Sequence, residues 1–299
     1  MVVRKVCFFA FILSIALFES CDDGVKTNEI SGPVNIKFNF YADSVYRYSI
    51  KNNIALTQEI DKDNSITINQ NMTMASSYSV VSLAPEGKNV SVTYERITMS
   101  SGNQLFSLDY DSENDNGTDP MYEDLRNLID KTFKMTVSEK GDIVSSEPVI
   151  VGQGTTNSAY NFNDSSIRKI MLHILQVYPG RDVQPGDIWE RTYLTSVGFA
   201  NVRVKNKYQL VSVIDGIAHI ELQGRVTSEK NEQAQNSNMT LNGVQTGSLD
   251  IAVNSGLVEH GKILQTLSGD MNITGANTPV TVESNIYIMG VTKKAVELK

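Results

Sequence analysis

"ANVRVKNKYQLVSVIDGIAHIELQGRVT", residues Ala200–Thr227, is the stretch that decides the fold class. Apolar and polar residues alternate on both sides of the dipeptide Asp215-Gly216. Alternation with a period of two is typical of a strand that buries one face, and Asp-Gly favours a two-residue hairpin turn. The stretch therefore predicts two strands that pair with each other through a tight turn.

The same alternation recurs along most of the chain, and the off-phase positions are polar. Sheets with one solvated face are antiparallel, so the fold class expected is mainly β with antiparallel sheets. Pro85 and Gly87 predict a further hairpin turn. Further strands are predicted at Val34–Phe40, Tyr46–Ile50, Ser65–Met74, Tyr78–Leu83, Val90–Met99, Phe133–Val137, Gly141–Ser145, Trp189–Val197, Gly247–Val253, Leu257–Gly269 and Val280–Val291.

Two segments have a helical period instead. The first is Met121–Asp130. The second spans 166–178, where Asp164 or Ser165 can cap the start and Pro179-Gly180 ends the helix. Its apolar stripe consists of Ile167, Ile170, Met171, Ile174, Leu175 and Tyr178. We therefore expect one or two amphipathic helices laid over a sheet.

An internal repeat divides the chain into two similar halves. Tyr78–Ser82 resembles Tyr208–Ser212, and Thr136–Val144 resembles Ala252–Val258 in the same order. The two β halves would either pack as a sandwich or curl into a shared half-barrel. The organisation expected is a signal peptide (1–20), a tether (21–33), a first β half (34–150), a linker with the helix (151–187) and a second β half (188–299).

The N-terminus predicts export. Arg4 and Lys5 precede the apolar run Val6–Phe18, which is too short for a membrane span and typical of a secretory signal. Ser20 then precedes Cys21, and this junction resembles the lipobox of bacterial lipoproteins. The resemblance implies cleavage before Cys21 and attachment of a diacylglycerol, with its palmitate-type chains, to that cysteine.

Two acidic residues, Asp22 and Asp23, follow the cysteine. They resemble the surface-export signal of Bacteroidota lipoproteins, which implies a lipid-anchored protein of the outer membrane, with the cell surface favoured over the periplasmic face. The other cysteine, Cys7, lies in the signal, so the mature chain has no internal disulfide.

Three segments carry a resemblance to a wider family. They are Val177–Tyr193, Val204–Gly224 and Thr246–Val258. These segments resemble an uncharacterised family of Bacteroidota outer-membrane lipoproteins of unknown function. The resemblance supports export and implies no catalytic residues.

The residues themselves offer little chemistry. A formal charge of −8 argues against nucleic acid as a partner. None of His173, His219 and His260 has a second histidine or cysteine at metal-ligand spacing, and no HExxH, CxxC or GxSxG motif occurs. We therefore expect no enzyme activity, no metal and no cofactor.

The most acidic stretch is Asp109–Pro120, which contains Asp109, Asp111, Glu113, Asp115 and Asp119. An EF-hand requires glycine at loop position six, and asparagine stands there in either register. A solvated connection and a calcium loop of another kind remain as alternatives. The polar segment Asn231–Gly243 is expected to be a long loop, and Asn277–Val280 a shorter turn.

The function expected is a non-catalytic, lipid-anchored envelope protein that binds a hydrophobic or lipid-like ligand. Met171 and Trp189 are the ligand-binding candidates, although core packing with a paired N–H is the main role expected of Trp189. One alternative is an adaptor that binds another envelope protein. A calcium- or glycan-binding module is a further alternative, and the single Trp argues against glycans.

Overall fold

The computed structural model describes residues 28–147, 171–197, 200–229, 237–273 and 276–294. The predicted signal peptide, Cys21, Asp22 and Asp23 lie outside these ranges, and so does most of the predicted linker.

The described chain is dominated by one sheet of twelve strands, in which every pairing is antiparallel. The order is β6-β5-β3-β2-β1-β12-β11-β10-β9-β8-β7, and β4 pairs with β3 beside this path. The mainly-β prediction is confirmed. The strands are β1 (Ser44–Glu59), β2 (Ser65–Ala84), β3 (Gly87–Gly102), β4 (Ser107–Asp111), β5 (Thr132–Val137), β6 (Ile143–Ser146), β7 (Ile188–Val197), β8 (Ala200–Ile214), β9 (Ile217–Ser228), β10 (Ser237–Ala252), β11 (Val258–Ile273) and β12 (Ala276–Lys294).

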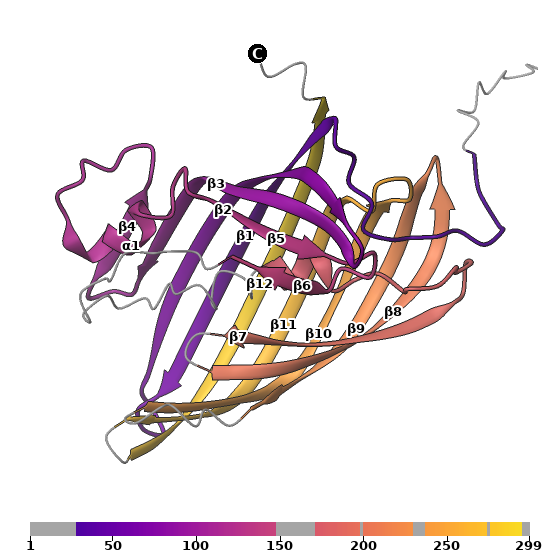
Figure 1. Ribbon diagram of the computed structural model, residues 1–299. Helices are drawn as coiled ribbons and strands as arrows, with labels where there is room; N and C mark the ends of the chain where they lie inside the picture. Colours follow the sequence, from indigo (N-terminus) through magenta and orange to yellow (C-terminus); the bar gives the residue numbers. More distant parts are fainter. Residues whose placement is uncertain (1–27, 148–170, 198–199, 230–236, 274–275, 295–299) are drawn as a thin grey trace, which may run out of the picture.

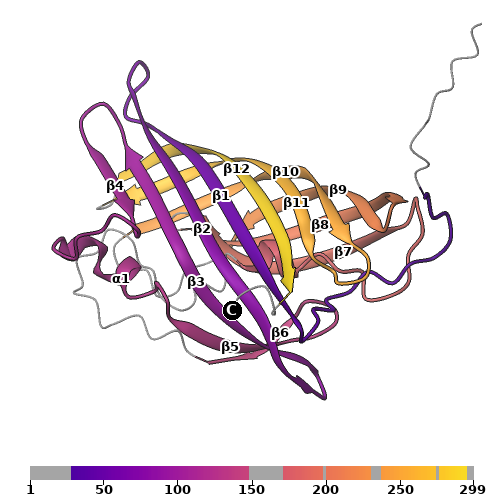
Figure 2. The same cartoon turned by 90° about the horizontal axis from the view of Figure 1, so that it is seen from above.

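The sheet curls strongly, and β7 at one edge comes round toward β5 and β6 at the other (Figures 1 and 2). An ion pair of 2.5 Å joins Arg191 of β7 to Asp142, which precedes β6. Of the two arrangements expected, the structure has the curved half-barrel. The sandwich is wrong, because β1 and β12 pair along their length and join the halves into one sheet.

The repeat is visible in the sheet. The spatial order β6-β5-β3-β2-β1 in one half corresponds to β11-β10-β9-β8-β7 in the other, and β12 stands between them. Each half has a two-residue hairpin, at Pro85-Glu86 and at Asp215-Gly216. The register also shifts at equivalent places, between Val80 and Ser82 and between Leu210 and Ser212. A bulge at the same point of both repeats confirms that the halves are similar.

The segment 34–40 is not a strand of the sheet, contrary to the prediction. Its side chains alternate as expected, with Ile36, Phe38 and Phe40 each 1% exposed. Its backbone instead bonds to Val183 and to the turns at Glu139 and Ser255. The segment crosses the end of the concave interior, where its side chains pack in the core. The alternation of its sequence therefore reflects side-chain burial and not backbone pairing with a strand of the sheet.

The helical segments are short. Residues 171–175 are helical, and the rest of the predicted stripe before them lies outside the described residues. Within Met121–Asp130 the structure has the 3₁₀ turn η1 (Pro120–Tyr122) and the helix α1 (Glu123–Arg126). The predicted helix therefore shrinks to about one turn, which packs through Leu125 into the core, and Leu128 after it is also buried there.

Two predicted connections prove to be strand. Residues 237–243 belong to β10, where they pair with β11 along its far end, and Asn277–Val280 belong to β12. Residues 231–236 lie outside the described ranges. Strand propensity depends strongly on context, and here long neighbouring strands extend the ladder through polar sequence.

Candidate functional site

The described end of the helix lies on the concave face and is bound into the core. Met171, Ile174 and Leu175 are buried there. Trp189 stacks on Tyr208 at 5.7 Å between ring centroids, and its Nε1 donates to the carbonyl oxygen of Val177 over 2.9 Å. Both predicted ligand residues, Met171 and Trp189, therefore make core contacts in this structure.

Tyr178 lies between equivalent turns of the two repeats. Its hydroxyl donates to the carbonyl oxygen of Gly256 over 2.7 Å. Gly141 occupies the matching turn in the other half, where a Cβ added to it would lie 2.8 Å from Cδ2 of Tyr178. Both glycines have positive φ, 78° for Gly141 and 74° for Gly256. A single aromatic side chain thus ties the two halves together at this end of the interior.

A row of buried amides crosses the concave face. Gln265 donates from Nε2 to Oε1 of Gln245 over 2.6 Å, and Gln245 donates from Nε2 to Oδ1 of Asn206 over 2.7 Å. Asn206 in turn donates to the hydroxyl of Tyr208 over 2.8 Å. The three amides are at most 4% exposed. An unpaired buried amide costs about 1–3 kcal/mol, so the row is stable because its members bond to one another.

A glycine on the intervening strand allows the amide side chains to meet in a continuous row. In the register of the sheet, Gly224 of β9 stands opposite both Asn206 and Gln245. A Cβ on Gly224 would lie 2.0 Å from Oδ1 of Asn206. The missing side chain is therefore what lets two amides meet across an intervening strand.

The amide row divides the interior into two apolar clusters. On β8, Tyr208 belongs to the first cluster and Val204 to the second, with Asn206 between them. The first cluster is filled from within by the segment 34–40 and by Tyr178. The second cluster, which we call the distal cluster, contains Tyr193, Val197, Ala200, Val202, Val204, Val226, Met239, Leu241, Leu267, Val280 and Val282.

A histidine and a tyrosine stand where the row meets the helix. The hydroxyl of Tyr193 lies 3.3 Å from Nδ1 of the partly buried His173. Burial lowers the pKa of His173 to about 4, because a charged imidazolium is poorly solvated there. Burial also raises the pKa of Tyr193 to about 12, although the amides of Gln245 and Asn206 beside it act in the opposite direction. Both groups are therefore neutral near pH 7.

Sequence reasoning missed the amide row. A signal was present, because Asn206 stands in phase with the inward-facing Val202, Val204 and Tyr208 of the same strand. A polar residue on the buried phase of an alternating strand needs a partner. The partners, Gln245 and Gln265, come from strands whose register cannot be derived from one sequence.

Arginines pair with three of the five acidic residues of the stretch Asp109–Pro120. Arg96 binds Asp111 at 2.9 Å and Glu113 at 2.8 Å, and Arg126 pairs with Asp115. These contacts hold the pKa values of Asp111 and Asp115 below their usual range. In the described part of the chain, no three histidine, cysteine or acidic side chains are grouped as metal ligands.

The other two histidines lie on the outer face of the sheet. Nδ1 of His219 is 2.7 Å from Oδ1 of Asp250, and His260 stands opposite Asp250 on the next strand. Across the described ranges, none of the helices has the length and apolar character of a membrane span.

Comparison with known proteins places the chain in a family but supplies no activity. The model of a family described as a family of unknown function (DUF6263) matches residues 86–147 and 155–258. No curated protein matches the chain.

Among solved structures, the fold is similar to that in "Lipid-protein interactions in lipovitellin", with a TM-score of 0.53 and 11% identity. The match covers 86% of this chain and 26% of that one, so the chain spans about a quarter of the length of its relative. A BenF-like porin from Pseudomonas fluorescens Pf-5 matches with a TM-score of 0.22 and 6% identity, over 85% of this chain and 100% of the porin.

Proposed function

The chain belongs to the family of unknown function DUF6263, and we propose that it is a non-catalytic protein that binds a lipid-like ligand on the concave face of its sheet. The observation that carries this proposal is the distal cluster. Its side chains are buried, and among the described residues outside the sheet Leu172 is the hydrophobic one that packs against it, beside the contact of His173 with Tyr193. Apart from Leu172, strands therefore supply the described hydrophobic side chains of this cluster.

The contrast between the two ends of the interior supports the proposal. The first cluster is filled by large side chains from non-strand segments, including Phe38, Phe40 and Tyr178. The wall of the distal cluster is mainly valine and leucine. Burial of a methylene is worth about 0.8 kcal/mol, so an acyl chain laid along this wall would gain several kcal/mol.

The amide row would bind the polar end of the ligand. The apolar part of an amphipathic molecule would pack against the distal cluster. Its polar end would then lie near Gln245, Gln265 and the His173–Tyr193 pair. Small-molecule sites commonly combine apolar walls with a few placed polar groups. The fold likeness to lipovitellin supports the same proposal at the level of strand arrangement alone.

We also propose that the protein is anchored in the outer membrane through a lipid on Cys21, for the reasons that the N-terminal sequence provides. Metabolic labelling with an alkyne analogue of palmitate tests the anchor. We expect label on the native chain and none on Cys21→Ser, which should leave the membrane fraction. Equal labelling of both chains would overturn the anchor without affecting the ligand proposal.

Native mass spectrometry tests the ligand. The chain carrying Cys21→Ser is purified from its host without detergent. We expect an added mass that organic extraction removes. Leu241→Trp, which enlarges an inward side chain of the distal cluster, should lower the occupancy. Val244→Trp is the matched control, because Val244 lies on the same strand and is 57% exposed.

Thermal unfolding of both variants separates loss of ligand from loss of fold. A clean mass for the parent chain, or equal occupancy in the two tryptophan variants, would overturn the proposal. Chemical cross-linking in the envelope would then address the adaptor function instead.

A further inference from the structure

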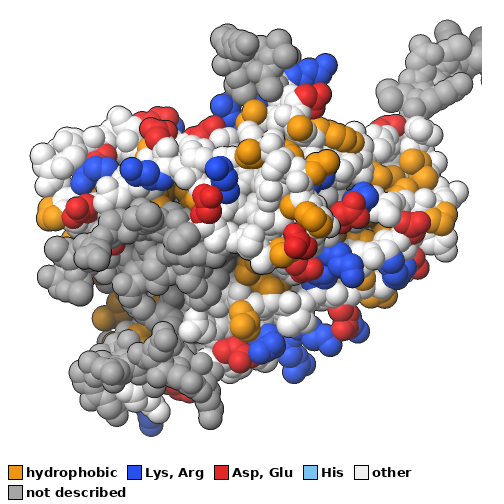
Figure 3. All heavy atoms as spheres, viewed as in Figure 1, with side chains coloured by type: hydrophobic (Ala, Val, Ile, Leu, Met, Phe, Trp, Pro, Cys, Tyr) orange, Lys and Arg blue, Asp and Glu red, His pale blue; other side chains and the backbone are white. Residues whose placement is uncertain are grey.

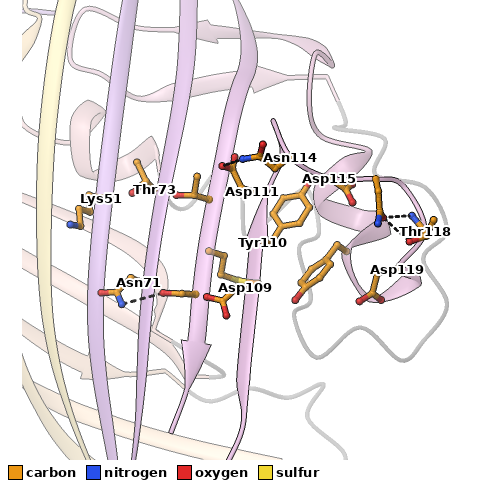
Figure 4. A pocket seen from close by; sticks show the side chains of 15 residues that line it. Lys51, Asn71, Thr73, Asp109, Tyr110, Asp111, Asn114, Asp115, Thr118 and Asp119 are labelled. Atoms are coloured by element: carbon orange, nitrogen blue, oxygen red, sulfur yellow. Dashed lines mark hydrogen bonds between the residues drawn. The ribbon is translucent and has the colours of Figure 1, made fainter.

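A second site lies away from the concave interior, at the short strand β4. A pocket of about 810 Å³ is bounded by β1 to β4 and by the loop that follows β4 (Figure 4). The close view shows Tyr110 between the strand residues Asn71 and Thr73 on one side and the loop residues Thr118 and Asp119 on the other. Figure 3 shows acidic and basic side chains mixed over the face of the molecule that is seen in Figure 1.

The lining is mostly neutral and polar. Hydroxyl and amide side chains converge on the pocket from different elements, namely Asn71, Thr73, Ser100, Asn114, Asn116 and Thr118. Nδ2 of Asn71 reaches Oγ of Ser100 at 3.3 Å, and Thr118 donates to Oδ1 of Asn116. Such groups both donate and accept hydrogen bonds, which suits a ligand rich in hydroxyls.

Two carboxylates in the pocket have no cation partner within the described chain. Asp109 accepts from the hydroxyl of Ser107 over 2.7 Å, and Asp119 accepts from the backbone N–H of Met121 over 2.9 Å. The other two carboxylates, Asp111 and Asp115, are paired with arginines. The site therefore contains two carboxylates that are not paired with a cation of the described chain and can accept hydrogen bonds from a ligand. Because the other two are paired with arginines, the site has no large excess of negative charge.

Tyr110 supplies independent evidence that the pocket is a binding site. The residue lines the pocket and is 6% exposed, yet its hydroxyl has no hydrogen-bond partner among the described residues. A buried polar group without a hydrogen-bond partner destabilises the folded chain. Burial raises the pKa of Tyr110, so the phenol keeps its proton. The Tyr122 ring lies 4.9 Å away and adds an apolar surface.

We propose that this pocket binds a neutral saccharide. Vicinal hydroxyls of a sugar would donate to Asp109 and Asp119 and exchange hydrogen bonds with the amides. The Tyr110 hydroxyl is buried in this structure, and on a turn of its ring toward the sugar it would gain the partner that it lacks among the described residues. A metal ion fits less well, because no group of three acidic or histidine ligands occurs among the described residues. An organic cation fits less well because Lys51 also lines the pocket.

Saturation-transfer NMR on the chain carrying Cys21→Ser tests this site. The probes are neutral di- and trisaccharides of glucose, galactose, mannose and N-acetylglucosamine at millimolar concentration. We expect transfer to at least one of them. Tyr110→Phe, which removes only the unpaired hydroxyl, should weaken binding about threefold to tenfold, and Asp109→Asn by tenfold or more.

Glu113→Gln is the matched control, because Glu113 lies in the same loop, pairs with Arg96 and does not line the pocket. It should bind as the parent chain does. No transfer from any saccharide, or equal affinities in all variants, would overturn the proposal. Binding of spermidine or Ca²⁺ that depends on Asp109, without saccharide binding, would assign a cation site instead. Leu241→Trp should leave saccharide binding intact, so this proposal and the ligand proposal fail separately.

Discussion

Gln245 and Asn206 hydrogen-bond to each other across a strand that separates them. The distance from Nε2 of Gln245 to Oδ1 of Asn206 is 2.7 Å, although β9 lies between their strands. Strands two places apart are separated by about 9–10 Å, so long side chains and an empty position between them are both necessary. Gly224 is that empty position.

Gly224→Ala should therefore destabilise the protein through the amides. The new Cβ would lie 2.0 Å from Oδ1 of Asn206, which must move and leave buried amides unpaired. We expect the free energy of unfolding to fall by about 2–4 kcal/mol, measured by urea denaturation. Gly32→Ala is the control, because no atom lies within 4 Å of the added carbon.

A double-mutant cycle identifies the cause. Asn206→Ala removes the side chain that the new Cβ meets, so the combined variant should be more stable than the sum of the single losses predicts. Strict additivity of the two losses would show that the glycine is needed for another reason.

Two buried tyrosines should respond differently to loss of their hydroxyls. Tyr178 donates to Gly256 over 2.7 Å, whereas the hydroxyl of Tyr94 has no partner among the described residues. We expect Tyr178→Phe to lower the free energy of unfolding by about 1–2 kcal/mol, and Tyr94→Phe, which removes an unpaired buried hydroxyl, to leave it unchanged or raise it. Paired urea titrations check this, and equal losses would contradict it.

The equivalent turns of the two repeats should be equally intolerant of side chains. A Cβ on Gly141 would lie 1.8 Å from the carbonyl oxygen of Leu175, and one on Gly256 would lie 2.0 Å from that of Lys37. We expect Gly141→Ala and Gly256→Ala each to cost about 3 kcal/mol or more, from backbone strain and displacement together.

Gly117→Ala measures the cost of backbone strain at a positive φ separately from the cost of close contacts. Gly117 also has positive φ, 76°, but nothing lies within 4 Å of its added carbon. The loss there should stay near about 1 kcal/mol. A loss at Gly117 as large as at the two turns would refute the role of the close contacts.

His173 should make stability depend on pH. Its pKa is about 4 in the folded chain and about 6.5 when unfolded, so the unfolded state binds more protons between these values. Stability should fall as the pH drops from 6.5 toward 4, by up to about 3 kcal/mol. Below pH 4 this contribution should not change further.

His173→Gln should flatten the pH dependence between pH 4 and 6.5. His260→Gln is the control, because His260 is exposed on the outer face. Urea titrations at a series of pH values measure the slope. An unchanged slope in the His173 variant would mean that other groups cause the acid loss.

Much of the strand pattern could be predicted from the sequence, because it depends on neighbouring residues. Alternation placed β8 and β9, and Asp215-Gly216 predicted the turn between them, where φ is 51° and 81°. The resemblance between Tyr78–Ser82 and Tyr208–Ser212 predicted the two halves. These inferences succeed because side-chain period and turn conformation are properties of a few consecutive residues.

What remained could not be predicted, because it depends on residues far apart in the chain. Segment 34–40 alternates like a strand but bonds to turns more than a hundred residues away. Residues 237–243 have loop composition but are held as strand by β11. For the acidic stretch the sequence left a solvated connection and a calcium loop as alternatives, and it did not show that Arg96 and Arg126 lie beside it.

The sequence by itself determined most of the strands, their antiparallel character and the repeat. Only the tertiary structure decided that the halves join into one curled sheet, that the amides form a row, and that the Tyr110 hydroxyl has no hydrogen-bond partner among the described residues. The physical reason is that register and curvature arise from packing between strands. A polar residue on a buried phase shows that a partner exists, but only the register shows which residue it is.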